Sequence, residues 1–126
     1  MTVLMFQKQF VTAVLSGRKR QTIRPKRKRP LRIGEVLSLR HWYDKAYRSP
    51  QVEFATVKCT GTFDIEIRSP GIRIGLASRL KTDAAWLDDF ARGDGFESWL
   101  EMREFFESRF GYGLPFQGVL IQWEKK

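Results

Sequence analysis

The sequence predicts a single α+β domain in which helices pack on a mainly antiparallel sheet. Several segments alternate apolar and polar residues, as half-buried strands do, and others repeat apolar residues at helical spacing. The order along the chain is strand, helix, several strands, helices and a final strand, which is typical of an α+β fold. At 126 residues the chain suits one hydrophobic core, so we expect one domain over residues 1–126.

The N-terminal segment is expected to form a strand over residues 3–6 and a helix over residues 9–16. Apolar side chains recur here at helical spacing: Phe6, Phe10 and Val14. Gly17 follows where this pattern stops, as a glycine in the left-handed region does after a helix. Residues 21–24 then favour a short extended segment, because Pro25 biases the residue before it away from helix.

A basic loop is predicted between Pro25 and Pro30. Its four successive cations, residues 26–29, repel one another, so we expect the loop to be exposed and mobile. A turn at residues 34–35 leads into residues 36–42, whose alternation predicts a half-buried strand.

The middle of the chain is predicted to form a long strand over residues 52–67. Gly61 interrupts its alternation, and a glycine inside a strand pattern often marks a β-bulge. A turn at residues 69–71 separates this strand from residues 72–74, which fit either a short strand or an irregular loop.

Two helices are predicted in the C-terminal half, over residues 83–91 and 96–110. Thr82 is the expected N-cap of the first helix. Gly111 is expected to end the second, and residues 116–123 alternate as a final strand. The second helix has an apolar stripe with glutamates opposite it: Trp99, Met102, Phe106 and Phe110.

The charge of the chain favours an anionic partner. The net charge is +9 and the isoelectric point is about 10.1, which indicates nucleic acid before a membrane surface. Residues 18–48 hold twelve Lys or Arg and two acids, whereas acids outnumber bases in residues 82–111. This single basic lobe favours a binding face for RNA, single-stranded nucleic acid or a nucleoside, and we expect no membrane partner.

Metal, disulfide and cofactor chemistry is not expected. Cys59 and His41 are the only residues of their kinds, so an internal disulfide cannot form and a structural zinc site is not favoured. The alternating apolar run around Cys59 is typical of a core residue. No run is long enough to span a membrane, and the N-terminal apolar run is too short for a signal peptide. We therefore expect a cytoplasmic protein without a cofactor.

The region around residues 16–37 holds the most distinctive motifs. They are Gly17-Arg18-Lys19-x-x-Thr22-Ile23-Arg24 and Ile33-Gly34-Glu35-Val36-Leu37. Together they resemble the signature of the ASCH domain, a family similar in fold to the PUA domains that bind RNA. This chain departs from the family pattern at Arg20, where Thr is common, and at Glu35, where Asp is common. The resemblance spans the chain from Phe6 to about Trp123.

The ASCH resemblance implies a small, PUA-like, partly closed β-barrel of about five or six mainly antiparallel strands with flanking helices. Some small bacterial ASCH proteins are acetylcytidine amidohydrolases, thought to use a Lys, a Thr and a Glu. By position these are Lys19, Thr22 and Asp94, the last followed by Gly-Phe as in the family but one methylene shorter than Glu. Glu97 and Glu101 are alternative acids, and Asp94 also fits the N-cap of the second helix.

The chemistry of such a trio depends on the charge of Lys19. Partial burial and three arginines nearby in sequence are expected to lower its pKa from about 10.4. These arginines are Arg18, Arg20 and Arg24. A neutral Lys19 would take the Thr22 hydroxyl proton during attack on an amide carbon, with Asp94 orienting Lys19 or protonating the leaving amine. A charged Lys19 would instead bind a phosphate or stabilise an oxyanion.

Aromatic and basic residues interleave after residue 39, and they form a predicted nucleobase platform because bases stack on aromatic faces. The residues are Arg40, Trp42, Tyr43, Tyr47 and Arg48. The alternative is that these aromatics cover one end of the fold. For the basic segment before Pro25, the alternative is a solvated cationic face beside an ordinary strand.

Two main hypotheses follow for function. The first is an ASCH-type domain that binds RNA or a modified nucleoside in a basic cleft lined by Lys19, Thr22 and Arg24. The second is a hydrolase, either an acetylcytidine amidohydrolase or a ribonuclease, that uses Lys19, Thr22 and an acid. A third hypothesis is a protein-interaction module whose basic loop meets an acidic partner.

Overall fold

The structure is a computed structural model and describes residues 1–75, 78–110 and 115–125. Its strands are β1 (Thr2–Met5), β2 (Gln21–Arg24), β3 (Val36–Trp42), β4 (Gln51–Ile67), β5 (Ile72–Ile74) and β6 (Phe116–Lys125). Its helical segments are one turn of 3-10 helix, η1 (Lys8–Phe10), and three α-helices, α1 (Val11–Leu15), α2 (Ala84–Gly93) and α3 (Trp99–Phe110).

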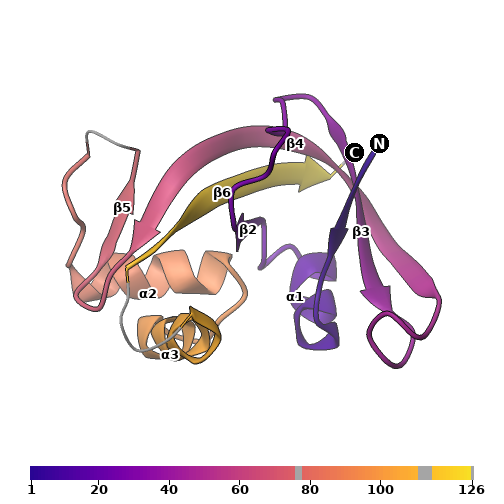
Figure 1. Ribbon diagram of the computed structural model, residues 1–126. Coiled ribbons are helices and arrows are strands. Elements are labelled where there is room, and N and C mark those ends of the chain that lie inside the picture. The colour runs from indigo at the N-terminus through magenta and orange to yellow at the C-terminus, as the bar shows by residue number, and fades with distance from the viewer. Residues whose placement is uncertain (76–77, 111–114, 126) are drawn as a thin grey trace.

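The strands form one sheet in the order β1-β3-β4-β6-β2, and β5 pairs with the end of β4. The β1–β3 pair is parallel, and the other pairs are antiparallel. Figure 1 shows β4 and β6 arching over the helices, with α2 and α3 beneath one end and α1 beneath the other. The α+β fold is therefore confirmed. The outer strands β1 and β2 share no backbone pairing within the described ranges, so the sheet is not closed.

The long strand β4 is central to the sheet, because it pairs with β3, β5 and β6. Its pairing with β6 shifts between Cys59 and Gly61, which confirms the predicted bulge. A Cβ at Gly61 would lie 2.9 Å from the Phe63 ring, so any larger residue here would have to displace that ring. A bulge bends a strand and increases its twist, and it therefore helps the sheet to arch.

The core lies between the sheet and the helices and contains many fully buried aliphatic side chains. Leu37, Leu39, Ile67 and Met102 are each 0% exposed. Cys59 is buried as expected. Ser38, which alternates with the two leucines of β3, is buried as well, and its hydroxyl donates to Glu53. The strand is thus buried on both faces at this point, not half-buried as predicted.

The start of α2 differs from the prediction by one residue. The Asp83 carboxylate accepts a hydrogen bond of 2.9 Å from the Trp86 amide, so Asp83 is the N-cap and the expectation for Thr82 is wrong. An aspartate cap also places negative charge at the positive end of the helix dipole.

The second predicted helix begins at Trp99, three residues later than expected. Asp88 of α2 accepts the Trp99 amide at 2.9 Å, and the Ser98 hydroxyl accepts the Glu101 amide at 3.2 Å. These two acceptors satisfy two of the free amides at the helix start and help to fix where α3 begins. The expected end of the helix at Gly111 and the side chain of Phe110 lie outside the described residues.

Near the N-terminus the single helix expected over residues 9–16 is divided into η1 and α1. Gly17 has φ +84°, which confirms a left-handed residue after this helix. The backbone then enters β2, which pairs with the last strand, β6.

We predict that Met102→Ala lowers the free energy of unfolding by about 2–5 kcal/mol, because it opens a cavity in the core beneath α3. Leu100→Ala on the same helix is the matched control, since Leu100 is 53% exposed, and its effect should stay within about 0.5 kcal/mol. Urea unfolding followed by circular dichroism measures both. Equal losses in the two variants would contradict the buried face assigned to α3.

Candidate functional site

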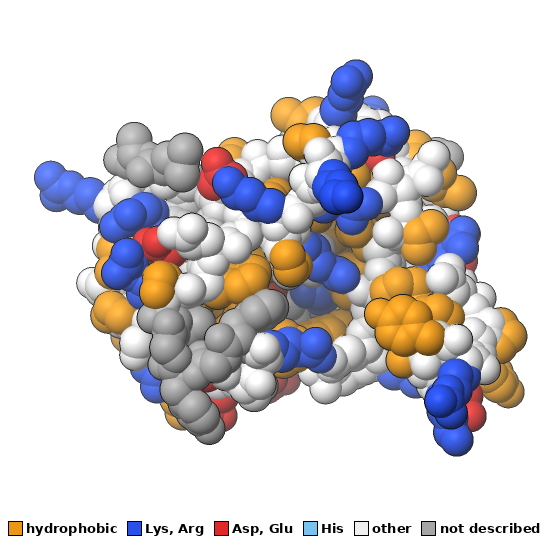
Figure 2. Space-filling view, in the orientation of Figure 1, with side chains coloured by type: hydrophobic (Ala, Val, Ile, Leu, Met, Phe, Trp, Pro, Cys, Tyr) orange, Lys and Arg blue, Asp and Glu red, His pale blue; other side chains and the backbone are white. Residues whose placement is uncertain are grey.

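A cavity of about 450 Å³ opens between the end of β1, strand β2, the loop after β3 and helix α3. Figure 2 shows a hollow near the middle of this face, with Lys and Arg side chains beside it. Much of its wall is aromatic, from Phe6, Phe10, Trp42, Tyr47, Phe96 and Phe105. Its charged residues among those described are Lys19, Arg24, Asp94 and Arg109.

The backbone joins the turn that carries Lys19 to the end of α2 that carries Asp94. The Arg20 amide donates to the Gly93 carbonyl at 3.0 Å, and the Lys19 amide donates to Ala13 at 2.9 Å. Asp94 is the C-cap of α2, so its possible role as N-cap of the next helix is wrong. Two residues distant in sequence are thereby fixed beside one another.

Gly95 provides the space that the Lys19 side chain needs. Its φ is +97°, and a Cβ there would lie 2.9 Å from Lys19 Cδ and 3.0 Å from the Phe10 ring. A larger residue would therefore be strained by its backbone conformation and would also push the lysine stem away.

Lys19 is 3% exposed, and its ammonium lies among aromatic rings and carbonyl oxygen. Nζ donates to the Asp94 backbone carbonyl at 2.5 Å, lies 3.8 Å from Asp94 Oδ1 and is 4.9 Å from the Phe10 ring centre. Burial lowers the pKa of Lys19 to about 8. The Asp94 charge acts in the opposite direction and raises this pKa, and the Arg24 charge lowers it further.

Asp94 is shifted in the opposite direction. Burial raises the pKa of its carboxyl group to about 6, although Lys19 and the Gln21 side chain favour the charged form. Oδ1 has no hydrogen-bond partner within the described part of the chain. Both members of the pair are thus moved toward their neutral forms, which is common for groups at functional sites.

Arg24 spans the cavity from β2 toward β1. Its Nε donates to Thr22 Oγ1 at 3.1 Å, and its Nη2 donates to the Met5 carbonyl at 2.6 Å. The guanidinium also lies 4.6 Å from the Phe6 ring centre. Burial lowers the pKa of Arg24 to about 10. The Asp94 charge raises this pKa in part, and the Arg27 and Arg109 charges lower it further.

Thr22 is 5% exposed and lines the cavity. Because its hydroxyl oxygen already accepts from a guanidinium, negative charge developing on that oxygen would be stabilised. Lys19, Thr22 and Asp94, the three residues that the ASCH resemblance implies, all line this one cavity.

The remaining predicted binding residues divide into two groups. Trp42 and Tyr47 line the cavity and contact each other with ring centres 5.1 Å apart. The residues that do not line it are Arg18, Arg20, Arg40, Tyr43 and Arg48. Arg40 instead donates to Ser38 and Gln51 within the sheet, so this part of the predicted platform is not assembled.

The alternative acids and the single histidine lie outside the cavity. Glu97 is exposed and pairs with Arg18 at 3.3 Å, and Glu101 is exposed on α3. His41 contacts the Trp42 carbonyl and the Phe54 ring, as an ordinary strand histidine does.

Phe105 and Arg109, which were not among the predicted site residues, line the cavity from α3. The two stack on each other, with the guanidinium 4.6 Å from the ring centre. Their spacing of four residues on one helix is a signal that could have identified them as one surface.

No group of residues suited to a metal ion is found within the described ranges. None of the helices, over the same ranges, is long and apolar enough to span a bilayer. Comparisons with protein-family models, with curated proteins and with solved structures give no match.

We predict that the difference in free energy of unfolding between the wild type and a Lys19→Met/Asp94→Asn variant depends on pH. Because the variant lacks both titrating groups, this difference should be least favourable to the wild type near neutral pH. Because the folded pKa of Asp94 is raised from 3.8 to about 6, the native state holds the extra proton and stability falls as pH rises across that window. Because the folded pKa of Lys19 is lowered from 10.5 to about 8, the unfolded chain holds the extra proton and stability rises with pH there.

Urea unfolding at a series of pH values measures this difference. The wild type should be least stable relative to the double variant between about pH 6 and 8. A difference that is flat with pH would mean that neither group is shifted by burial.

Proposed function

We propose that the chain is an ASCH-type domain whose cavity binds a base of single-stranded RNA or a modified nucleoside. The observation that carries this proposal is one cavity that combines an aromatic wall with three cations and a single carboxylate. Aromatic faces stack on any base, and surplus positive charge attracts the phosphates beside it.

The size of the cavity supports the same ligand class. Its volume of about 450 Å³ lies within the usual range for small-molecule sites. Trp42, Tyr47, Phe10 and Phe105 all contribute aromatic rings to its wall. A planar base stacked on these rings would have its polar edge within reach of Lys19 and of Asp94 Oδ1, which accepts no hydrogen bond within the described residues.

A partly closed PUA-like barrel is part of this proposal. The supporting contact is the hydrogen bond from Arg24 of β2 to the Met5 carbonyl at the end of β1. This side chain joins the two outer strands of the sheet where backbone pairing does not. The arch of β4 and β6 in Figure 1 brings those edges toward each other.

A second candidate function is hydrolysis of an acylated nucleoside, favoured by the contacts of Thr22. A neutral Lys19 would accept the hydroxyl proton as Thr22 Oγ1 attacks the amide carbon. Arg24 would stabilise the developing negative charge, and the amine would leave with a proton from Asp94 or Lys19. Water would then hydrolyse the acyl-threonine and regenerate the hydroxyl.

We predict that Tyr47→Asn weakens binding of a short oligouridylate by about fivefold or more, because a base loses one stacking face. Asparagine suits the position because Tyr47 has φ 63°, in the left-handed region. Tyr43→Asn in the same loop is the matched control, since both tyrosines are exposed but Tyr43 does not line the cavity. Fluorescence titration measures both affinities. An equal effect of the two variants would contradict the binding of a base in this cavity.

For the hydrolase we expect release of acetate from acetylcytidine in the order wild type, then Thr22→Ser, with Lys19→Arg and Thr22→Val near background. Serine retains a hydroxyl and valine does not, whereas a guanidinium stays protonated and cannot act as the base. The wild-type rate should rise with pH toward the Lys19 pKa of about 8. No release by the wild type would reject hydrolysis of this substrate, and an active Lys19→Arg variant would place the base elsewhere.

A further inference from the structure

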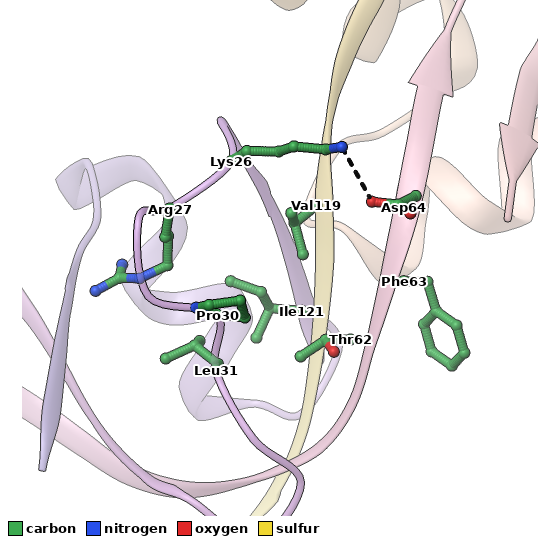
Figure 3. Close-up of a pocket in the computed structure, with 9 residues that line it drawn as sticks. All are labelled: Lys26, Arg27, Pro30, Leu31, Thr62, Phe63, Asp64, Val119 and Ile121. Atoms are coloured by element: carbon green, nitrogen blue, oxygen red, sulfur yellow. Dashed lines mark ion pairs between the residues drawn. The ribbon is translucent and has the colours of Figure 1, made fainter. Parts of the chain in front are cut away.

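A second cavity lies beside the basic loop and has no part in the function proposed above. Its volume is about 300 Å³, and it lies between this loop, which follows β2, and the strands β4 and β6 (Figure 3). Leu31, Val119 and Ile121 give it an aliphatic floor, while the loop contributes Lys26 and Arg27. It shares no lining residue with the first cavity.

The strand register places the strand residues of this floor on one face of the sheet. Three cross-strand pairs of β4 and β6 follow one another on that face: Thr62 with Ile121, Asp64 with Val119, and Glu66 with Gln117. Phe63 falls on the opposite face, and Figure 3 shows its ring directed away from the cavity. Along the strands the floor therefore changes from aliphatic to polar.

The cavity continues past an ion pair into a smaller polar hollow. Lys26 Nζ lies 3.7 Å from Asp64 Oδ1 (Figure 3), and both residues also line a hollow of about 140 Å³ beside Arg73 and Gln117. Both side chains of the pair are more than a third exposed, so the pair contributes little to stability and a competing carboxylate can open it. The cavity and the hollow together form a groove that suits an extended chain.

The basic loop presents its cations on a restricted backbone. Its residues are exposed as predicted, and Pro25 and Pro30 limit the backbone at its two ends. The next residue, Leu31, is 7% exposed and anchors the loop in the core. Arg27 and Lys28 form no ion pair within the described residues. A partner therefore meets free cations on a loop that loses little freedom when it binds.

We propose that this groove binds an acidic segment of a partner protein, with one aliphatic side chain of that segment in the cavity. The aliphatic side chain packs on Val119 and Ile121, a neighbouring carboxylate takes Lys26 from Asp64, and a second carboxylate pairs with Arg27. An apolar anchor in a pocket with charges around it is typical of the residues that dominate a protein interface. This inference goes beyond the proposed function, because it uses other residues and another class of partner.

The groove favours a peptide over a second stretch of nucleic acid. Phe63 is the one aromatic residue among the described residues that line it, and its ring points away, whereas single-strand sites stack bases on aromatic rings. The carboxylates of Asp64 and Glu66 also lie along the groove, where they repel a chain that carries a phosphate on every residue. A peptide can place uncharged residues there, and its backbone N–H groups can donate to these carboxylates.

The test measures the binding of two short fluorescein-labelled peptides to the full chain by fluorescence anisotropy. In one peptide a single leucine stands among glutamates, and in the other peptide serine replaces that leucine. The leucine peptide should bind about tenfold tighter or more, because its side chain is removed from water in the cavity. Val119→Thr should weaken the leucine peptide by about threefold and leave the serine peptide unchanged.

The charged residues of the groove are tested with the same peptides. Arg27→Gln should weaken both peptides by about two- to fivefold, the effect of one exposed ion pair. Asp64→Asn should strengthen both peptides, because it frees Lys26 and removes a negative charge from the groove. A merely structural role of Asp64 predicts no such gain.

The matched controls are Val52→Thr and Arg32→Gln, which make the same kind of substitution at residues that do not line the groove. Neither control should change the affinity for either peptide. Saturating uridine monophosphate should not displace the leucine peptide, because the two cavities are separate. Circular dichroism shows that each variant is folded.

Three outcomes would overturn the inference. If the two peptides bind equally, or if Val119→Thr and Val52→Thr have equal effects, charge alone accounts for the binding and the cavity takes no side chain. If neither peptide binds, the groove has no acidic partner, while binding of uridine monophosphate, measured separately, decides the proposed function. If an oligouridylate displaces the leucine peptide and is itself weakened by Val119→Thr, the groove belongs to nucleic acid.

Discussion

The buried pair of Lys19 and Asp94 is the constraint on which the rest of the site depends. Burial moves both pKa values toward the neutral forms, to about 8 and about 6, so the pair is not a source of folding stability. The backbone nevertheless holds it in place through the Arg20–Gly93 hydrogen bond and the absence of a side chain at Gly95. A chain selected for stability alone would fill this space with apolar residues. The retention of two charges here is therefore an argument for a ligand or a reaction.

Arg24 connects this pair to the architecture of the sheet. One side of its guanidinium holds the Thr22 hydroxyl and the other holds the end of β1, so the same side chain positions the site and joins the outer strands. Its charge also makes the cavity more positive than Asp94 can neutralise. Arg27, three residues further along the chain, adds to this positive charge and lowers the pKa of Arg24.

The strands could be predicted because their signal is local, and β4 even shows its bulge at Gly61 in the sequence. The start of α3 could not, since the residue that accepts the Trp99 amide is Asp88, eleven residues earlier and on another helix. The cavity was predicted only in part for a similar reason. Arg18 and Arg24 are close in sequence, but Arg18 pairs with Glu97 outside the cavity, whereas Arg24 lines it. The contribution of α3 depends on tertiary packing that no local pattern contains.

Binding and hydrolysis place opposite demands on Lys19, and its pKa decides how both can be met. With a pKa of about 8, roughly one lysine in ten is neutral at pH 7, enough to act as a base while most molecules carry the charge. A phosphate placed against Nζ would raise that pKa and remove the neutral fraction. Any phosphate that a hydrolytic substrate carries must therefore lie away from Lys19, near Arg109, with the amide alone reaching Lys19 and Thr22. A ligand that is only bound has no such restriction, so the position of its phosphate separates the two functions.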